Sequence, residues 1–335
     1  MSRRSSHIPS LPSLLERKIS KTGQTRGADD DEIYQNRVNR NNTVLIRFPY
    51  WATCSTPPPN EKSFENGFIV LISPNEYFEN PGNMQILAAN GLALGINTLV
   101  FYETRTAWNA HDPDSLGWTP ANSRVGNLGG QYVARVSATT ATNEGAKIVR
   151  GFVTTSLKGA GIRVYEYASN TTIAQCRLQL EAMFWTCADS VDVAINNGMS
   201  QEGALARKEY IMQNCVNSGL LDLDRLMGAR ILNERHNTIC PLCLEELSAQ
   251  GFFNRMAQAE GREVLDLTIT QLNLFHIQEL RVGSYNHHPY NIGWGHHHCN
   301  VVVRDSGIQQ TLSWINNVLQ RNIAAGHFKS DSKEN

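Results

Sequence analysis

Two short clusters of cysteine and histidine in the last third of the sequence have the spacing of metal ligands. Cys240 and Cys243 are separated by two residues, and so are His296 and Cys299. Two such pairs supply four ligands for one tetrahedral ion, and zinc favours mixed sets of nitrogen and sulfur. Because four protein ligands leave no open position, we predict a structural zinc site formed by Cys240, Cys243, His296 and Cys299.

The identity of the histidine ligand is open, because His297 and His298 follow His296 directly; the spacing favours His296. A lone pair of cysteines could also be a redox dithiol, but nothing around it resembles a thioredoxin-type unit, and the second cluster needs its own explanation. The seven cysteines are an odd number, and the polar start of the chain does not resemble a secretory signal. We therefore expect reduced thiols and a cytoplasmic protein of a bacterium or archaeon.

The segment between the two clusters contains a histidine and two asparagines at distinctive intervals. A short predicted strand ends at His276, a loop leads to Asn291, and Asn300 follows the second cluster. His276 and Asn291 are 15 positions apart, and Asn291 and Asn300 are 9 apart. With Leu280 and Gly283 in the usual places, this segment resembles the HNH endonuclease motif, a ββα-metal fold that cuts DNA.

The resemblance implies a role for each of these three side chains. Hydrolysis of a phosphodiester needs an activated water and a cation to neutralise the charge that builds up on the phosphate. His276 would be the general base, and Asn291 would orient the loop or the imidazole. Asn300 would bind one Mg²⁺ through its amide oxygen, a ligand that suits a hard cation.

The sequence departs from this motif at one position. The residue before the base histidine is commonly a metal ligand in the family, whereas here it is Phe275, which cannot bind a metal. Glu279, or one of Asn286, His287 and His288, would then supply the missing magnesium ligand. Alternatively, DNA phosphate and water hold the cation.

The remaining sequence indicates the elements that must position these residues. From about Thr43 to Glu166, short β-branched and aromatic runs alternate with turn clusters, which predicts a mostly antiparallel sheet or an open barrel. From Thr172 to about Asn196, and again from Ser200 to about Arg235, apolar residues recur at helical spacing. These segments predict two or three core helices, one of them capped by Ser200.

Length, composition and charge limit the classes of protein. A chain of 335 residues with 41% apolar residues predicts two domains, and no apolar run is long enough for a membrane span. We predict an α+β protein with a basic N-terminal arm (1–30), a β-rich DNA-recognition and dimerisation domain with core helices (31–225) and a zinc-stapled ββα-metal nuclease domain (226–335). The net charge of −1 excludes a protein that coats nucleic acid by bulk charge.

Contacts with DNA must therefore be local. The run from Asn36 to Asn42 has side chains that read base edges, namely Asn36, Arg37, Asn39 and Arg40, and Arg26 lies among glycines that would let it approach a phosphate. A polar surface loop before a strand explains the same run, and this alternative stays open.

Over the whole chain, the sequence resembles BstXI-like type II restriction endonucleases. The resemblance is carried by the segments 21–27 and 33–40 and by the C-terminal pattern from Asn286 to Asn300. It implies a homodimer that cuts double-stranded DNA at an interrupted palindrome, and a partner methyltransferase that protects the same site in the host. Two alternatives remain: a non-catalytic zinc-ribbon DNA-binding protein, and a homing or modification-dependent HNH nuclease.

Overall fold

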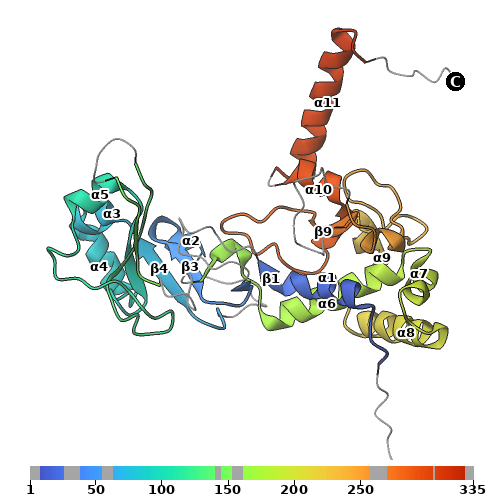
Figure 1. The fold of residues 1–335 in the computed structure, drawn as a ribbon, viewed down its shortest axis with the longest axis horizontal. Coiled ribbons are helices and arrows are strands. Elements are labelled where there is room, and N and C mark those ends of the chain that lie inside the picture. Colours follow the sequence, from blue (N-terminus) through green and yellow to red (C-terminus); the bar gives the residue numbers. More distant parts are fainter. Residues whose placement is uncertain are drawn as a thin grey trace, which may run out of the picture. The chain divides into compact units, whose positions relative to one another are not determined.

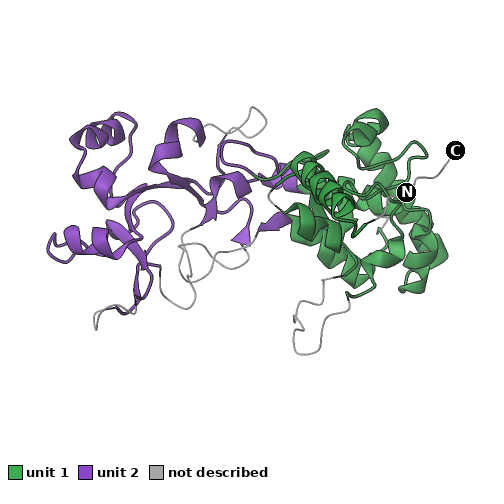
Figure 2. Ribbon diagram, turned by 90° about the horizontal axis from the view of Figure 1, so that it is seen from above, with its two compact units in different colours: residues 1–22, 174–280, 288–335 green, residues 23–173, 281–287 purple. Residues whose placement is uncertain are grey.

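The chain forms two compact units, which are coloured separately in Figure 2. Unit 1 comprises Met1–Thr22, Ala174–Leu280 and His288–Asn335, and unit 2 comprises Gly23–Ile173 and Arg281–His287. The structure, a computed structural model, describes residues 8–25, 38–54, 63–139, 145–152, 161–256, 270–304 and 306–328. None of the helices in these ranges is long and apolar enough to cross a membrane.

Unit 2 is built on a six-stranded sheet with the strand order β7-β6-β5-β4-β3-β8. Its strands are β3 (Val44–Arg47), β4 (Phe68–Ile72), β5 (Thr98–Tyr102), β6 (Tyr132–Val136), β7 (Ile148–Arg150) and β8 (Ile162–Arg163). The pairs β3–β4, β3–β8, β4–β5 and β5–β6 are parallel, and only β6–β7 is antiparallel among the six strands. The sheet is therefore mainly parallel.

The prediction of a mostly antiparallel sheet or open barrel is wrong for this unit. In β4 every residue after Phe68 is buried, and all five residues of β5 are buried. Strands covered on both faces are continuous apolar runs without an alternation of polar and apolar residues, which is typical of parallel sheets. The runs at 68–72 and 98–102 carry this signal in the sequence, but the short helices between them have little helical periodicity of their own.

Short helices connect the strands of unit 2, and Figure 1 shows α3, α4 and α5 beside its sheet. The helices are η2 (Phe48–Tyr50), α2 (Trp51–Cys54), α3 (Pro74–Phe78), α4 (Pro81–Ala89), α5 (Arg105–Ala110) and η3 (Val164–Glu166). A capping box starts α3: the Ser73 hydroxyl accepts from the Glu76 amide, and Glu76 accepts from the Ser73 amide. A separate antiparallel pair joins β1 (Gln24–Thr25) to β2 (Val38–Asn39).

Unit 1 combines helices with one β-hairpin around a large apolar core. Its elements are α1 (Ser13–Ser20), η1 (Lys21–Gly23, its last residue in unit 2), α6 (Asn170–Trp185, from Ala174 onward), α7 (Ser190–Asn196), α8 (Gln201–Asn217), α9 (Leu223–Gly228), η4 (Ala249–Phe252), β9 (Leu272–His276), β10 (Ile292–His296), α10 (His297–Val303) and α11 (Ile308–Ala324). The predicted core helices are present, and the Ser200 hydroxyl caps α8 by accepting from the Gly203 amide at 3.0 Å. The second helical segment ends at Asn217, and α9 follows as a separate helix.

Part of the predicted basic N-terminal arm (1–30) forms helix α1, which packs into the core of unit 1. Leu15 is fully buried, Ile19 is 6% exposed, and both belong to the core of unit 1. The ammonium of Lys18 is also buried and donates to the carbonyl of Leu272 at 2.6 Å. This basic residue of the predicted N-terminal arm therefore ties α1 to the start of β9.

The division into units differs from the predicted boundaries at residues 30 and 225. One apolar cluster unites Leu15, Leu180, Leu226, Phe275 and Ile308, so α1, α6, α9, β9 and α11 share a core. The helices that the sequence assigned to a recognition domain therefore support the C-terminal hairpin. Apolar periodicity identifies the buried face of a helix but not the element that the face will contact.

Candidate active site and metal centre

The candidate active site is a hairpin and a helix in unit 1. Strands β9 and β10 are antiparallel, with His276 opposite Ile292 and Phe275 opposite Gly293. Helix α10 follows β10 without a loop, and the His297 amide at its start donates to the carbonyl of Gln271 at 2.7 Å. The helix contacts both strands. The segment 272–303 therefore has the order and arrangement of a ββα unit.

Close packing explains the glycine at position 295 of β10. A Cβ atom on Gly295 would lie 2.7 Å from Cδ2 of Phe275, whose ring is fully buried. Trp294 is buried as well, and its indole nitrogen donates to the carbonyl of Leu180 at 2.8 Å. These two rings anchor the hairpin in the core of unit 1. Phe275 therefore serves packing and offers no metal ligand at this position.

The four predicted zinc ligands are brought together. The ligand atoms of Cys240, Cys243, His296 and Cys299 all lie within 4.8 Å of one another, and Sγ of Cys243 lies 3.3 Å from Nδ1 of His296. Sulfur ligands on one tetrahedral zinc lie ~3.8 Å apart, because each Zn–S bond is about 2.3 Å long. The spacing and the donor types fit a structural zinc ion.

The structure distinguishes the three neighbouring histidines. His296 ends β10 and faces the cysteines. By contrast, Nδ1 of His297 lies 2.9 Å from Nδ2, the side-chain amide nitrogen of Asn273. The ring of His298 stacks on that of His296, with 5.2 Å between centroids. Of the three, His296 is the one that joins the cluster, as the spacing favoured.

The side chains of this cluster shift one another's pKa values. Burial raises the pKa of the Cys299 thiol, and the neighbouring sulfurs of Cys240 and Cys243 raise it further. Burial likewise raises the pKa of Cys243, whereas burial and the nearby His298 lower the pKa of His296. Three thiolates this close repel one another, and a divalent cation removes that repulsion when it binds them. The imidazole is already biased toward the neutral form that binds metals.

The backbone around the first cysteine pair is held by hydrogen bonds. The Cys240 amide donates to the Glu245 carbonyl, and the Leu244 amide donates to the Cys240 carbonyl, both at 2.9 Å. Arg230 supports the turn from outside: its Nε donates to the carbonyl of Pro241 at 2.7 Å. Sequence reasoning missed this arginine, and its only local signal is that it precedes the turn by about ten residues. Its contact ties Arg230 to the turn between the two cysteines.

The predicted catalytic residues lie on the ββα unit. His276 is the last residue of β9 and is partly exposed. The buried side chain of Asn291 bonds twice to the backbone of Gln278: its Oδ1 accepts from the amide at 2.8 Å, and its Nδ2 donates to the carbonyl at 3.0 Å. Asn291 thus holds the chain just after His276. On α10, Nδ2 of Asn300 donates to the carbonyl of Leu274 at 3.2 Å, two residues before His276.

Glu279, His287 and His288 are candidate magnesium ligands outside the motif, and each contacts a different part of the chain. A Cβ on Gly307, at the start of α11, would lie 2.6 Å from a carboxylate oxygen of Glu279, so the Glu279 side chain rests against that turn. His287 is 1% exposed, and Nδ1 of His288 lies 2.7 Å from the carbonyl of Pro289. None of these contacts assigns a magnesium ligand.

The candidate DNA-binding residues fall partly outside the described residues, namely Arg26, Asn36 and Arg37. Asn39 is exposed on β2, in keeping with a surface contact. Arg40 is only 5% exposed, and its Nη1 donates to the carboxylate of Glu166 at 2.9 Å and to the Glu166 carbonyl at 3.0 Å. Its guanidinium therefore has a structural use within unit 2.

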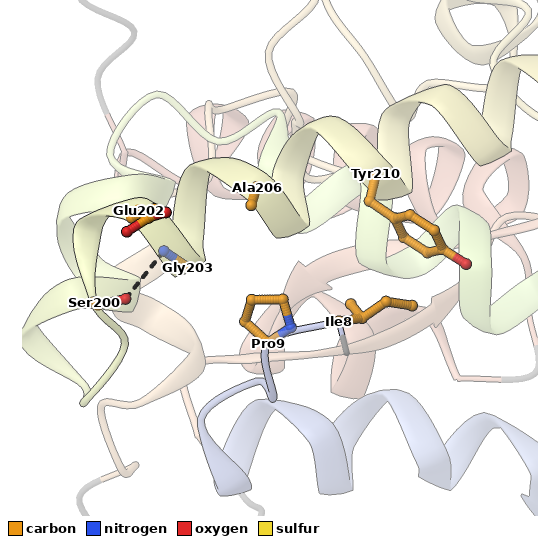
Figure 3. A pocket seen from close by; sticks show the side chains of 7 residues that line it. All are labelled: Ile8, Pro9, Ser200, Glu202, Gly203, Ala206 and Tyr210. Carbon is orange, nitrogen blue, oxygen red and sulfur yellow. Dashed lines mark hydrogen bonds between the residues drawn. The ribbon is translucent and has the colours of Figure 1, made fainter. Parts of the chain in front are cut away.

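Two cavities lie away from these residues within their own units. In unit 1, a cavity of about 430 Å³ separates Ile8 and Pro9 from α8, where Gly203, Ala206 and Tyr210 line it (Figure 3). In unit 2, a cavity of about 280 Å³ is lined by Arg47 of β3 and Phe101 of β5, among others. Neither cavity contains a residue of the predicted site.

Comparisons with known proteins gave one matching solved structure and one matching family model. A solved structure titled "Crystal structure of a type II restriction endonuclease" is 16% identical to this chain, with a TM-score of 0.27. The match covers 47% of this chain and 57% of that one, so the chain spans little more than half of that protein's length. No curated protein matches the sequence.

A family model covers most of the chain. The model described as BstXI restriction endonuclease matches residues 17–297, which include parts of both units and the segment from Cys240 to His296. Cys299, Asn300 and α11 lie beyond the matched range. With most of its length matched, the chain belongs to the BstXI restriction endonuclease family.

Proposed function

We propose that this protein is a type II restriction endonuclease that hydrolyses phosphodiester bonds of duplex DNA at a specific site, with Mg²⁺ as its catalytic cation. The single observation that carries the proposal is that His276, Asn291 and Asn300 lie on one ββα unit. That unit adjoins a cluster of three cysteines and one histidine. Family membership supports DNA cleavage in general.

His276 is the proposed general base. Its imidazole takes a proton from a water molecule, whose oxygen forms a bond to phosphorus while one phosphorus–oxygen bond of the DNA backbone breaks and the leaving oxygen takes up a proton. The backbone clamp by Asn291 fixes the chain immediately after His276, so it limits how far the imidazole can drift from the water. Asn291 is therefore a positioning residue.

Asn300 is the proposed magnesium ligand on this chain. Because its amide nitrogen is bound to the Leu274 carbonyl, the amide oxygen is the end that would hold a cation. Glu279, or phosphate oxygens and water, would complete the set of ligands, since Phe275 offers none. When bound, Mg²⁺ neutralises the charge that develops on the phosphate and the leaving oxygen.

The four-residue cluster is the proposed structural zinc site. It links the turn at Cys240 and Cys243 to the junction between β10 and α10, where His296 and Cys299 lie. A closed set of four ligands supplies stability and no open position for catalysis. Its chemistry would therefore be confined to holding the fold around His276.

Sequence recognition is the proposed role of unit 2, because an isolated ββα unit has little surface with which to read bases. Asn39, with Arg26, Asn36 and Arg37, remains a candidate contact, whereas Arg40 is buried. We further propose a homodimer that cuts an interrupted palindrome, with each copy cutting one strand and a methyltransferase modifying the same site in the host.

Plasmid cleavage tests the proposal. The wild-type protein should cut plasmid DNA into discrete fragments with Mg²⁺ and leave it intact with EDTA, and His276→Ala should lose at least a hundredfold of the cleavage rate. His327→Ala, at an exposed histidine after α11, is the matched control and should cut normally. Intact DNA with pure wild-type protein, or equal cutting by His276→Ala, would refute the assignment.

The same experiment separates the alternatives. A non-catalytic zinc-ribbon protein would bind DNA and zinc without cleaving in any condition. A homing or modification-dependent HNH nuclease would depend on His276 as well, but it would cut only long, rare sites or only modified DNA, and nonspecific cleavage would give a smear. Zinc should be found at about one ion per chain and should fall in Cys240→Ser, independently of cleavage.

A further inference from the structure

The loop between β9 and β10 belongs by its contacts to unit 2, although both strands belong to unit 1. Unit 1 includes the chain up to Leu280 and from His288 onward, whereas Arg281–His287 falls in unit 2 and is coloured with it in Figure 2. The chain therefore enters unit 2 after His276 and leaves it before Asn291. These two residues of the proposed active site flank a segment that is held by the other unit.

Tyr285 holds this loop within unit 2. Its hydroxyl donates to the carbonyl of Cys54, the last residue of α2, at 3.0 Å. Its ring stacks on that of Phe64, with 6.5 Å between the ring centroids and 28° between the ring planes. The partly buried ring packs on one apolar cluster of unit 2, whose buried members are Val38, Val44, Ile46, Cys54, Phe64, Ile162, Val164 and Tyr167. The ring and the hydroxyl together fix the place of Tyr285 in unit 2.

Hydrogen bonds within the loop limit its slack on both sides of Tyr285. On the side of β9, the Ser284 hydroxyl donates to the Arg281 carbonyl at 2.8 Å and accepts from the Arg281 amide at 3.2 Å. On the side of β10, the Asn291 amide donates to the His288 carbonyl at 3.2 Å. A displacement of Tyr285 is therefore passed along the chain in both directions.

Both ends of the loop are fixed at the proposed active site. The Asn291 side chain bonds twice to the backbone of Gln278, and the Ile277 amide donates to the Asn291 carbonyl at 2.9 Å. Ile277 and Gln278 directly follow His276, so these bonds hold the main chain next to the proposed base. Tyr285 lies nine residues after His276 and six before Asn291. The loop is thus anchored in unit 2 near its middle and in unit 1 at both ends.

The cluster that holds Tyr285 also holds the strand with a candidate DNA contact. Val38 of β2 is buried in this cluster, and Asn39, the next residue, is exposed. Successive side chains of a strand point to opposite faces, so Val38 joins the core while Asn39 faces outward. Because protein interiors are close-packed, a shift of one core side chain is felt by its neighbours. One core of unit 2 therefore supports both Asn39 and Tyr285.

We propose that Tyr285 is a positioning residue through which unit 2 holds the cleavage site of unit 1. Its contacts with Cys54 and Phe64 fix the loop, and the loop ends at the hydrogen bonds of Asn291 that hold the chain after His276. The inference rests on the proposed function for its consequence, which is that unit 2 contributes to the cleavage step as well as to the binding of DNA.

Hydrogen exchange of the full-length, zinc-loaded protein tests the anchor without DNA. The amides of Ile277 and Gln278 both donate to Asn291. In Tyr285→Ala they should exchange about fivefold faster or more than in the wild type, because the anchor includes at least one hydrogen bond. Tyr285→Phe removes the hydroxyl and keeps the ring in the cluster, so it should give a smaller increase in the same direction.

Tyr167→Phe is the matched control for Tyr285→Phe. Tyr167 belongs to the same cluster, and its hydroxyl donates to the Ser63 carbonyl at 3.1 Å. The control variant therefore also loses a hydroxyl bond of unit 2, but at a position outside the loop. Its exchange at Ile277 and Gln278 and its cleavage rate should match those of the wild type.

Plasmid cleavage tests the consequence for catalysis. At saturating DNA, Tyr285→Ala should lower kcat about tenfold or more and leave KM near the wild-type value, because the loop positions His276 while unit 2 keeps its DNA contacts. A zinc content of one ion per chain confirms that the variant retains unit 1. A normal kcat, or a rise in KM alone, would overturn the role in positioning.

The exchange result is distinct from the test of the proposed function. Unchanged exchange at Ile277 and Gln278 in Tyr285→Ala overturns the inference, whether or not the protein cuts DNA. Equally fast exchange in Tyr167→Phe and Tyr285→Phe also overturns it, because the cause would then be a general loosening of unit 2. A wild-type protein that leaves DNA intact refutes the proposed function, and the exchange comparison still decides whether Tyr285 anchors the loop.

Discussion

Replacing Gly295 by alanine should destabilise the hairpin, and the structure predicts why. Gly295 lies in β10, and a Cβ atom there would come within 2.7 Å of Cδ2 and 3.2 Å of Cγ of Phe275. The Phe275 ring is fully buried in the core of unit 1 and has little room to move. The backbone at Gly295 does not require glycine, since its φ is not positive. The effect of the substitution is therefore one of packing alone.

Gly293 provides the matched control for the magnitude. It lies two residues earlier in the same strand, and a Cβ there would meet its nearest atom, on Ile231, at an ordinary 3.4 Å. Both substitutions gain about 0.5–1 kcal/mol from the reduced freedom of the unfolded chain. Overpacking should cost Gly295→Ala about 1–3 kcal/mol in addition. The difference between the two variants in the free energy of opening isolates that cost.

Hydrogen exchange measures this difference locally. Amides of residues 272–296 should exchange roughly 5 to 150 times faster in zinc-loaded Gly295→Ala than in zinc-loaded Gly293→Ala, since about 1.4 kcal/mol corresponds to a factor of ten. When Phe275 is also replaced by valine, the difference in exchange rate between the two alanine variants should shrink. The reason is that valine lacks Cδ2, the carbon that lies 2.7 Å from the Cβ added at position 295. Equal protection in the two alanine variants would show that the packing of Phe275 on β10 is not as described.

Three further substitutions test the surroundings of the site. Arg230→Met should weaken zinc binding about 10- to 100-fold in a chelator competition, because it removes the donors that hold the carbonyls of the cysteine turn; unchanged affinity would exclude that support. Asn291→Ala should lower kcat about tenfold or more at unchanged zinc content, because the backbone of Gln278 loses both hydrogen bonds; a normal kcat would exclude a positioning role. Arg40→Met should cost unit 2 about 3 kcal/mol in urea unfolding, because Glu166 keeps a mostly buried carboxylate without its partner, and reduced DNA affinity at unchanged stability would instead restore Arg40 as a DNA contact.

The grouping of Cys240, Cys243, His296 and Cys299 was predictable from spacing, because each pair of candidate ligands is local in the sequence. Two residues between ligands suit a tight turn or the first turn of a helix, and the sequence contains both pairs. The choice among three adjacent histidines was less determined. It depends on β10 ending at His296 and on Asn273 of the paired strand lying next to His297, which only the register of the hairpin fixes.

The roles of single polar residues depended on partners that are distant in the sequence. The sequence alone suggests that Arg40 is a surface arginine. In the structure it binds Glu166, which lies 126 positions later. The sequence alone places Lys18 in a basic arm. In the structure its ammonium donates to the carbonyl of Leu272, which lies 254 positions away. Local sequence predicts the tendency of a residue to be polar or buried, but a buried charge is stabilised by a specific partner that no local pattern reveals.

The small size of the ββα unit explains why it is fixed from several sides. Strands β9 and β10 have five residues each and α10 has seven, which is too little to be stable in isolation. The side chain of Asn291 binds the backbone of Gln278 just before β10 begins, and His296, the last residue of β10, belongs to the cluster of candidate zinc ligands. His276 pairs with Ile292, one residue from that clamp, so its main chain is set by a strand constrained at both ends. If His276 is the general base proposed above, a structural zinc ion would contribute to catalysis without touching the substrate, by holding the strand that positions His276.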